Sequence, residues 1–179
     1  MHTDLYKVNL RSLSEGDHEL HWVLGDDYFQ HLGAEDFTSG EVYVDVYIHH
    51  IGGVFSLELE YDGYVGTTCD RCLDPLELDV YTERELVVKF GDEHREESEK
   101  FLIIPEQDGV LDLTWTMYED IVLSLPMQRM HEEGECNEDM MRAYSKVAAD
   151  EPQPQQQEIV RDEDGIDERW AALKQLKQE

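Results

Sequence analysis

The sequence predicts an α+β protein: a curved or barrel-like antiparallel β-sheet with two or three packed helices, followed by a flexible C-terminal tail. Apolar and polar residues alternate through about the first ninety positions, which is the period of half-buried strands. Apolar residues at helical spacing follow. After Ala149 the composition changes to proline, glutamine and acidic residues without apolar periodicity. We therefore expect a folded domain over residues 1–149, a flexible acidic, Pro- and Gln-rich linker over 150–165 and a helical motif over 166–179.

Alternating segments predict the strands of the first half of the chain. In the most regular one, every second residue from Val42 to Ile48 is apolar. Gly52 and Gly53 predict a tight hairpin after it, because paired glycines accept the positive φ that such turns require. The expected strands are residues 6–10, 20–24, 42–48, 55–61 and 76–90, with one or two helical turns over 26–32 and a bend over 81–85.

The second half of the chain begins with a charged segment and continues into the clearest helix. Residues 91–100 are almost wholly charged, which predicts a solvated loop, and short strands are expected at 101–104 and 110–113. The helix then starts with a capping box formed by Thr116 and Glu119 and stops before Pro126. Its apolar face is expected to comprise Trp115, Tyr118, Ile121, Val122 and Leu125.

A second helix is expected over residues 137–147. Asn137 suits its N-cap, because a short polar side chain accepts hydrogen bonds from the free N–H groups of the first turn. Its buried side should carry Met140, Met141 and Tyr144, with the methionines filling the core rather than binding a ligand.

The charge balance limits what the protein can bind. The chain of 179 residues has 43 Asp and Glu against 14 Lys and Arg, a formal net charge of −29. Broad contact with RNA or DNA requires a basic surface that releases counterions, so DNA binding is not expected. The chain begins with no signal pattern, and no window approaches the roughly 18 apolar residues of a membrane span. We expect a cytoplasmic protein without membrane contact.

Three cysteines and one histidine form a candidate metal site. Cys69 and Cys72 are separated by two residues and follow a strand that is predicted over 64–68; this spacing brings two sulfurs to one tetrahedral metal. His131 and Cys136 follow the main helix and complete a set of three thiolates and one imidazole, which would suit structural zinc. From spacing alone, free buried thiols are an equal alternative. A thiol oxidoreductase is a weaker one, because no helix follows to lower the pKa of a cysteine.

Four motifs follow one another along the chain: the Cys-Asp-Arg-Cys-Leu-Asp-Pro run at 69–75, Val-Leu-Asp-Leu at 110–113, Leu-Ser-Leu-Pro-Met at 123–127, and Asp-Glu-Arg-Trp-Ala-Ala-Leu-Lys at 167–174. Together they resemble the YceD family of large ribosomal RNA subunit accumulation proteins, a bacterial family. The resemblance covers most of residues 40–179. Glu168 departs from it, since proline is common at that place in the tail motif. There is also no second cysteine-rich cluster, so His131 and Cys136 are the candidates to complete the metal site.

The resemblance implies a role in ribosome biogenesis without established catalytic activity. A body of charge −29 would attract a basic protein of the large subunit, or an assembly intermediate that contains one. A protein that binds or processes large-subunit rRNA directly is the alternative function. The amphipathic tail motif is the expected partner-binding segment, because its apolar side chains suit a groove on another protein. Its candidate residues are Arg169, Trp170, Leu173, Lys174, Leu176 and Lys177.

Overall fold

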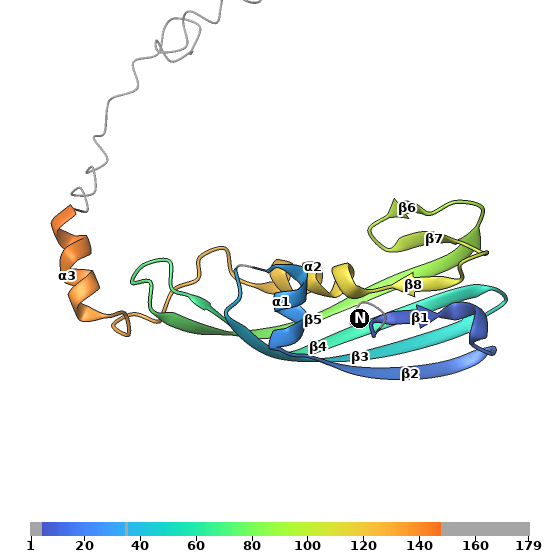
Figure 1. Ribbon diagram of the computed structural model, residues 1–179, viewed down its shortest axis with the longest axis horizontal. Helices are drawn as coiled ribbons and strands as arrows, with labels where there is room; N and C mark the ends of the chain where they lie inside the picture. Colours follow the sequence, from blue (N-terminus) through green and yellow to red (C-terminus); the bar gives the residue numbers. More distant parts are fainter. Residues whose placement is uncertain (1–4, 35, 148–179) are drawn as a thin grey trace, which may run out of the picture. The chain divides into compact units, whose positions relative to one another are not determined.

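The computed structural model describes residues 5–34 and 36–147. The chain divides into two compact units, Met1–Met141 and Arg142–Glu179. The first unit holds a large sheet, a small sheet and two helices, α1 and α2 (Figure 1). The linker expected at 150–165 and the helical motif expected at 166–179 lie outside the described residues.

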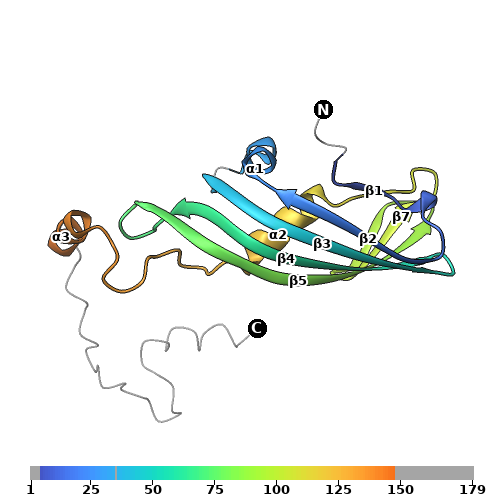
Figure 2. The same ribbon diagram turned by 90° about the horizontal axis from the view of Figure 1, so that it is seen from below.

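Six strands form the large sheet, in the order β2-β3-β4-β5-β7-β6. All neighbours are antiparallel except β5 and β7, which are parallel. The long strands curve along their length (Figure 2), but the sheet is open, with β2 and β6 at its edges, so it is curved rather than a closed barrel. The strands are β2 (Gly16–Leu24), β3 (Ser39–Ile51), β4 (Val54–Thr68), β5 (Pro75–Gly91), β6 (Arg95–Ser98) and β7 (Phe101–Pro105).

Two-residue alternation places one side of every long strand in the core. Val46 pairs with Leu59 across β3 and β4, and both side chains are fully buried. Gly52 and Gly53 form the turn between these strands at φ of 57° and 77°, as the sequence predicts. The bend expected at 81–85 is wrong, because β5 runs unbroken through those residues and its alternation of exposure continues.

A second layer covers one face of this sheet (Figure 1). It contains α1 (Asp26–Leu32), α2 (Thr114–Ser124), the short 3₁₀ helix Leu10–Ser12, and a two-stranded sheet of β1 (Lys7–Asn9) and β8 (Val110–Asp112). Its core-facing residues include Phe29 of α1 and Met117 and Ile121 of α2, which are all buried. The hydroxyl of Tyr28 in α1 donates to the carbonyl oxygen of Thr114 at 2.6 Å, which joins the two helices.

Several local expectations for the second half are wrong. The charged segment 91–100 contains a strand, β6, which pairs with β7. The expected capping box is absent from α2; instead Asp112 Oδ1 accepts from the N–H of Thr114 at 2.9 Å. Trp115 is 55% exposed, with its indole N–H donating to Glu119. The helix rotates Met117 rather than Trp115 into the core.

Helix α3 (Glu138–Val147) starts as predicted but does not bury the expected face. Asn137 Oδ1 accepts from the N–H groups of Asp139 and Met140 at 3.0 and 3.2 Å, which confirms the N-cap. Met140 and Tyr144 are exposed, whereas Met141 is half-buried. Of the three expected residues, Met141 packs against a buried cluster, that of the three cysteines, and the other two do not.

A buried polar network connects α2 to the sheet. Asp120 of α2 is 8% exposed and accepts a hydrogen bond from Tyr61 of β4 at 2.7 Å. The other oxygen of this carboxylate accepts from Arg84 of β5 at 2.6 Å. Burial disfavours the charge of Arg84, but the hydrogen bond and attraction of Asp120 raise the pKa of its guanidinium above the usual value. The network fixes α2 over the two central strands.

The other face of the large sheet has no described element over it. Its outward positions on β2 to β5 carry carboxylates interleaved with tyrosines, and we call this surface the acidic face. Its carboxylates are Asp17, Glu19, Glu41, Asp45, Glu58, Glu60, Asp62, Glu77, Asp79, Glu83 and Glu85, and its tyrosines are Tyr43, Tyr47, Tyr64 and Tyr81.

Gly63 allows the close approach of β3 and β4. An added Cβ there would lie 2.2 Å from the carbonyl oxygen of Glu41 and 2.8 Å from the Cα of Val42, which are backbone atoms. We expect Gly63→Ala to lower the free energy of unfolding by up to about 3 kcal/mol in urea titration. Gly25→Ala, where an added Cβ meets open space, should cost less than about 1 kcal/mol. Equal effects of the two substitutions would contradict this reasoning.

Candidate metal centre

Cys69 and Cys72 lie in the tight turn between β4 and β5. Cys69 donates its N–H to the carbonyl oxygen of Asp74 at 2.9 Å, and its own carbonyl accepts from the N–H of Leu73 at 2.9 Å. Leu73 adopts a positive φ of 63°, which is uncommon for a residue other than glycine. The turn therefore holds both thiols on one side by backbone hydrogen bonds.

The segment after α2 returns to this turn and brings the other two candidate ligands with it. Asp70 donates its N–H to the carbonyl oxygen of Arg129 at 2.7 Å, and its carboxylate accepts the N–H of Arg129 at 2.7 Å. Beyond the candidate ligands, the amide of Asn137 donates to the carboxylate of Asp74 at 3.1 Å. These contacts anchor the segment that carries His131 and Cys136 on both sides.

All four sequence-predicted residues are brought together. The ligand atoms of Cys69, Cys72, His131 and Cys136 lie within 4.8 Å of one another. The Sγ atoms of Cys69 and Cys136 are 3.9 Å apart, and Cys72 Sγ is 3.4 Å from His131 Nδ1. Tetrahedral zinc with ordinary bond lengths requires sulfur–sulfur separations of about 3.8 Å and sulfur–nitrogen separations of about 3.6 Å. The residues present therefore fit a tetrahedral metal ion.

The ring of His131 is oriented by its second nitrogen. Nε2 lies 3.0 Å from the carbonyl oxygen of Pro75. A carbonyl oxygen can only accept, so Nε2 carries the proton and Nδ1 of the neutral ring keeps its lone pair toward the thiols. This is the outer hydrogen bond that typically fixes a metal-binding histidine.

The three thiols form a small buried cluster apart from the main core. Leu76, Met130 and Met141 pack around them. Burial works to raise the pKa of Cys69, but N–H groups of the surrounding backbone hydrogen-bond to its sulfur and lower the pKa to about 6. Burial raises the pKa of Cys136, and a bound cation would favour the thiolate form of this side chain.

The arrangement suits a structural role better than catalysis. Four protein ligands complete a tetrahedral shell, so no coordination position is left for water or substrate. Cys69 is 0% exposed, and the turn leads into a strand rather than a helix N-terminus. A disulfide substrate therefore has no access to the thiol with the lowered pKa, which argues against the oxidoreductase alternative.

Sequence reasoning missed the groups that support the site. The paired bonds between Asp70 and Arg129 had no motif to reveal them, although Asp70 stands between the two cysteines. The partner-binding candidates of the tail, from Arg169 to Lys177, lie outside the described residues.

Within residues 5–34 and 36–147, no helix has the length and apolar character needed to cross a membrane.

Comparisons with curated proteins and with solved structures found no match. One family model, described as "Large ribosomal RNA subunit accumulation protein YceD", matches residues 57–177. That range begins in β4 and includes the Cys and His cluster, α2 and α3. The resemblance drawn from the motifs is therefore confirmed, and the chain belongs to the YceD family.

Proposed function

We propose that this protein is a non-enzymatic ribosome biogenesis factor that supports accumulation of large-subunit rRNA by binding a basic protein of the large subunit, free or in an assembly intermediate. The family description names large ribosomal RNA subunit accumulation. The net charge of −29 carries the proposal for how this is done. A field of this sign speeds the encounter with a cationic protein and disfavours contact with bare RNA.

The metal of the Cys69, Cys72, His131 and Cys136 site is proposed to be zinc. Three sulfurs and one imidazole nitrogen are the ligands that zinc prefers, and the separations of these atoms suit its tetrahedral shell. A bound ion would tie the β4–β5 turn to the segment after α2, so its role would be to hold these two parts of the chain together.

Binding to the two macromolecules of the large subunit tests the partner class. We expect the full chain to bind at least one basic protein extracted from purified large subunits at about 0.15 M salt, and to bind protein-free large-subunit rRNA at least tenfold more weakly. Filter binding and size-exclusion chromatography with purified components measure both.

The opposite preference would overturn the proposal. Direct RNA binding predicts a tight complex whose logarithmic affinity falls steeply with the logarithm of salt concentration, with a slope of about −0.7 to −0.9 per phosphate contacted. In cells, depletion of the protein should lower large-subunit rRNA relative to small-subunit rRNA. An unchanged ratio would contradict the role itself.

A further inference from the structure

Like charges stand opposite one another on the acidic face. Glu58 pairs in register with Glu85, and Glu60 lies between Asp45 and Glu83. Carboxylates directly opposite on neighbouring strands destabilise a sheet. The arrangement therefore costs folding stability, and a cationic partner would relieve the repulsion.

Four central carboxylates form no ion pair within the described part of the chain, although Lys100, which pairs with Glu85, also attracts Glu83. On the acidic face, Asp17 and Asp45 hydrogen-bond to histidine rings, and Glu85 forms an ion pair with Lys100. Among the described residues, no ion pair or hydrogen bond engages the side chains of the other central acids, namely Glu58, Glu60, Asp62 and Glu83. Their charges are available to a partner.

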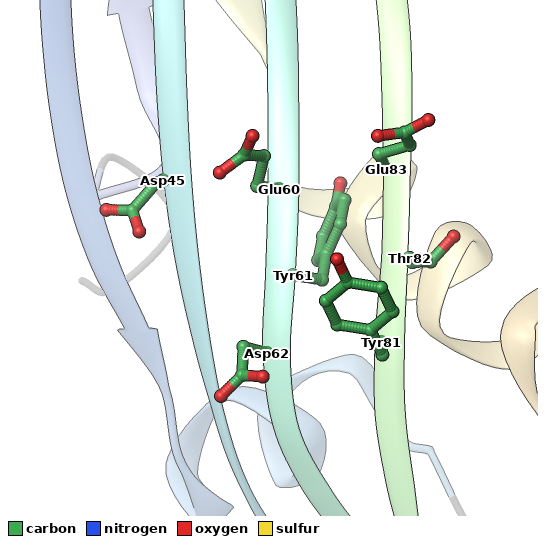
Figure 3. Close-up of a pocket in the computed structure, with 7 residues that line it drawn as sticks. All are labelled: Asp45, Glu60, Tyr61, Asp62, Tyr81, Thr82 and Glu83. Atoms are coloured by element: carbon green, nitrogen blue, oxygen red, sulfur yellow. The ribbon is translucent and has the colours of Figure 1, made fainter.

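A groove lies in the middle of this face. It has a volume of about 540 Å³ and runs over β3, β4 and β5 (Figure 3). Tyr81, which is 85% exposed, is one of its lining residues and pairs in register with Asp62 of β4. Glu60 and Glu83 lie on the side toward which its hydroxyl points (Figure 3). Aromatic faces and carboxylates together are the surroundings that guanidinium groups prefer.

The carboxylates are spread out rather than gathered at one point. In the described part of the chain, three or more potential metal ligands converge only in the Cys and His cluster, and the carboxylates of the acidic face form no such group. The acids of the face are instead repeated along β4 at every second residue, a spacing of about 6.8 Å. Same-side residues of an extended peptide have this spacing too. The repeat suits a row of cationic side chains better than a single metal ion.

We propose that the acidic face is a docking surface for an extended, arginine-rich polypeptide segment whose alternate side chains point toward the sheet. Arginines at every second position would each meet a carboxylate of β4 and its neighbours, and one would stack on Tyr81. The inference rests on the proposed function, because it names the surface and the chemistry of the basic partner.

The test uses a synthetic peptide of alternating arginine and serine, with its affinity for the full chain measured by fluorescence anisotropy. We expect the combined substitution Glu58→Gln, Glu60→Gln and Asp62→Asn to raise the Kd at least tenfold. Its melting temperature should stay the same or rise, because repulsion between strands is relieved. A loss of less than twofold would overturn the inference.

A matched control separates the face from net charge. The control variant, Asp92→Asn, Glu93→Gln and Glu96→Gln, also removes three negative charges, but from exposed positions around β6. This variant should raise the Kd less than about threefold, since it alters only the long-range field. Equal losses in both triple variants would mean nonspecific attraction and would overturn the docking surface.

The choice of cation and its spacing is tested on the peptide. Tyr81→Leu should raise the Kd for the arginine peptide about two- to fivefold, since stacking favours the planar guanidinium. It should raise the Kd for a lysine version of the peptide less. A peptide with its arginines grouped in one block should bind more weakly than the alternating one. Equal affinity for the blocked and alternating peptides would contradict the extended mode of docking.

Failure of this inference can be told apart from failure of the proposed function. Suppose that the full chain binds a basic large-subunit protein. If the tail variant Trp170→Ala with Leu173→Ala abolishes that binding and the triple variant of β4 does not, docking on the acidic face is overturned and the proposed function stands. If the intact chain binds no such protein, both are overturned.

Discussion

Cys72→Ser is expected to abolish zinc binding and to cause a large loss of stability. Elemental analysis of the intact chain should give about one zinc per molecule, and the variant should give none. A ligand that binds only the folded state adds about 4 kcal/mol when its free concentration is a thousand times Kd. A chelator should therefore lower the melting temperature of the intact protein and leave that of Cys72→Ser unchanged.

Histidine substitutions provide the matched comparison. His131→Ala removes the ligand nitrogen that lies 3.4 Å from Cys72 Sγ, whereas His94→Ala removes an exposed imidazole of the β5–β6 connection. The first should lose the metal and the second should retain it. An intact protein that contains no metal, and melts at the same temperature with and without chelator, would show that the cysteines are free buried thiols.

Asp120→Leu should be the most damaging substitution in the main core. It leaves the Arg84 guanidinium, whose side chain is 27% exposed, without its carboxylate, and leaves the Tyr61 hydroxyl without an acceptor. Removing one member of a buried ion pair costs about 3–5 kcal/mol. Denaturant titration should show this loss, and Glu119→Leu, at the exposed neighbouring position, should cost less than about 1 kcal/mol.

A double substitution shows where the cost comes from. Arg84→Met combined with Asp120→Leu removes both charges, so we expect it to be more stable than Asp120→Leu alone. Tyr61→Phe should cost only about 1 kcal/mol, because the carboxylate keeps its arginine. If the double variant is less stable than the single one, the stability of this region depends on packing rather than on the buried charge.

The strands could be predicted because their two faces differ. In β3 and β4 an apolar residue recurs at every second position, and the sheet buries that side whatever its neighbours are. The strand β6 is all exposed, so its backbone pairing with β7 left no pattern in the side chains. The parallel pairing of β5 with β7 depends on how the chain returns after β6, which local sequence does not specify.

The buried faces of the helices were harder to predict, because periodicity identifies an apolar stripe on a helix but not whether another element covers that stripe. Met140 and Tyr144 form such a stripe on α3, yet both are exposed. At the metal centre, the spacing of Cys69 and Cys72 and the use of all three cysteines were enough to select the four residues that lie together. The hydrogen bonds that anchor them join Asp70 to Arg129 and Asn137 to Asp74, pairs about sixty residues apart, and no local pattern indicates which distant groups will meet.

The pairing of β1 with β8 has a consequence for synthesis of the chain. Lys7 pairs with Asp112, and Tyr6 accepts the N–H of Leu113, so the first strand meets its partner only after more than a hundred residues have been made. At translation rates of about 5–20 residues per second this delay is roughly 5–20 s. The segment that carries β1 must therefore wait until β8 has emerged from the exit tunnel, and this layer cannot be completed before then.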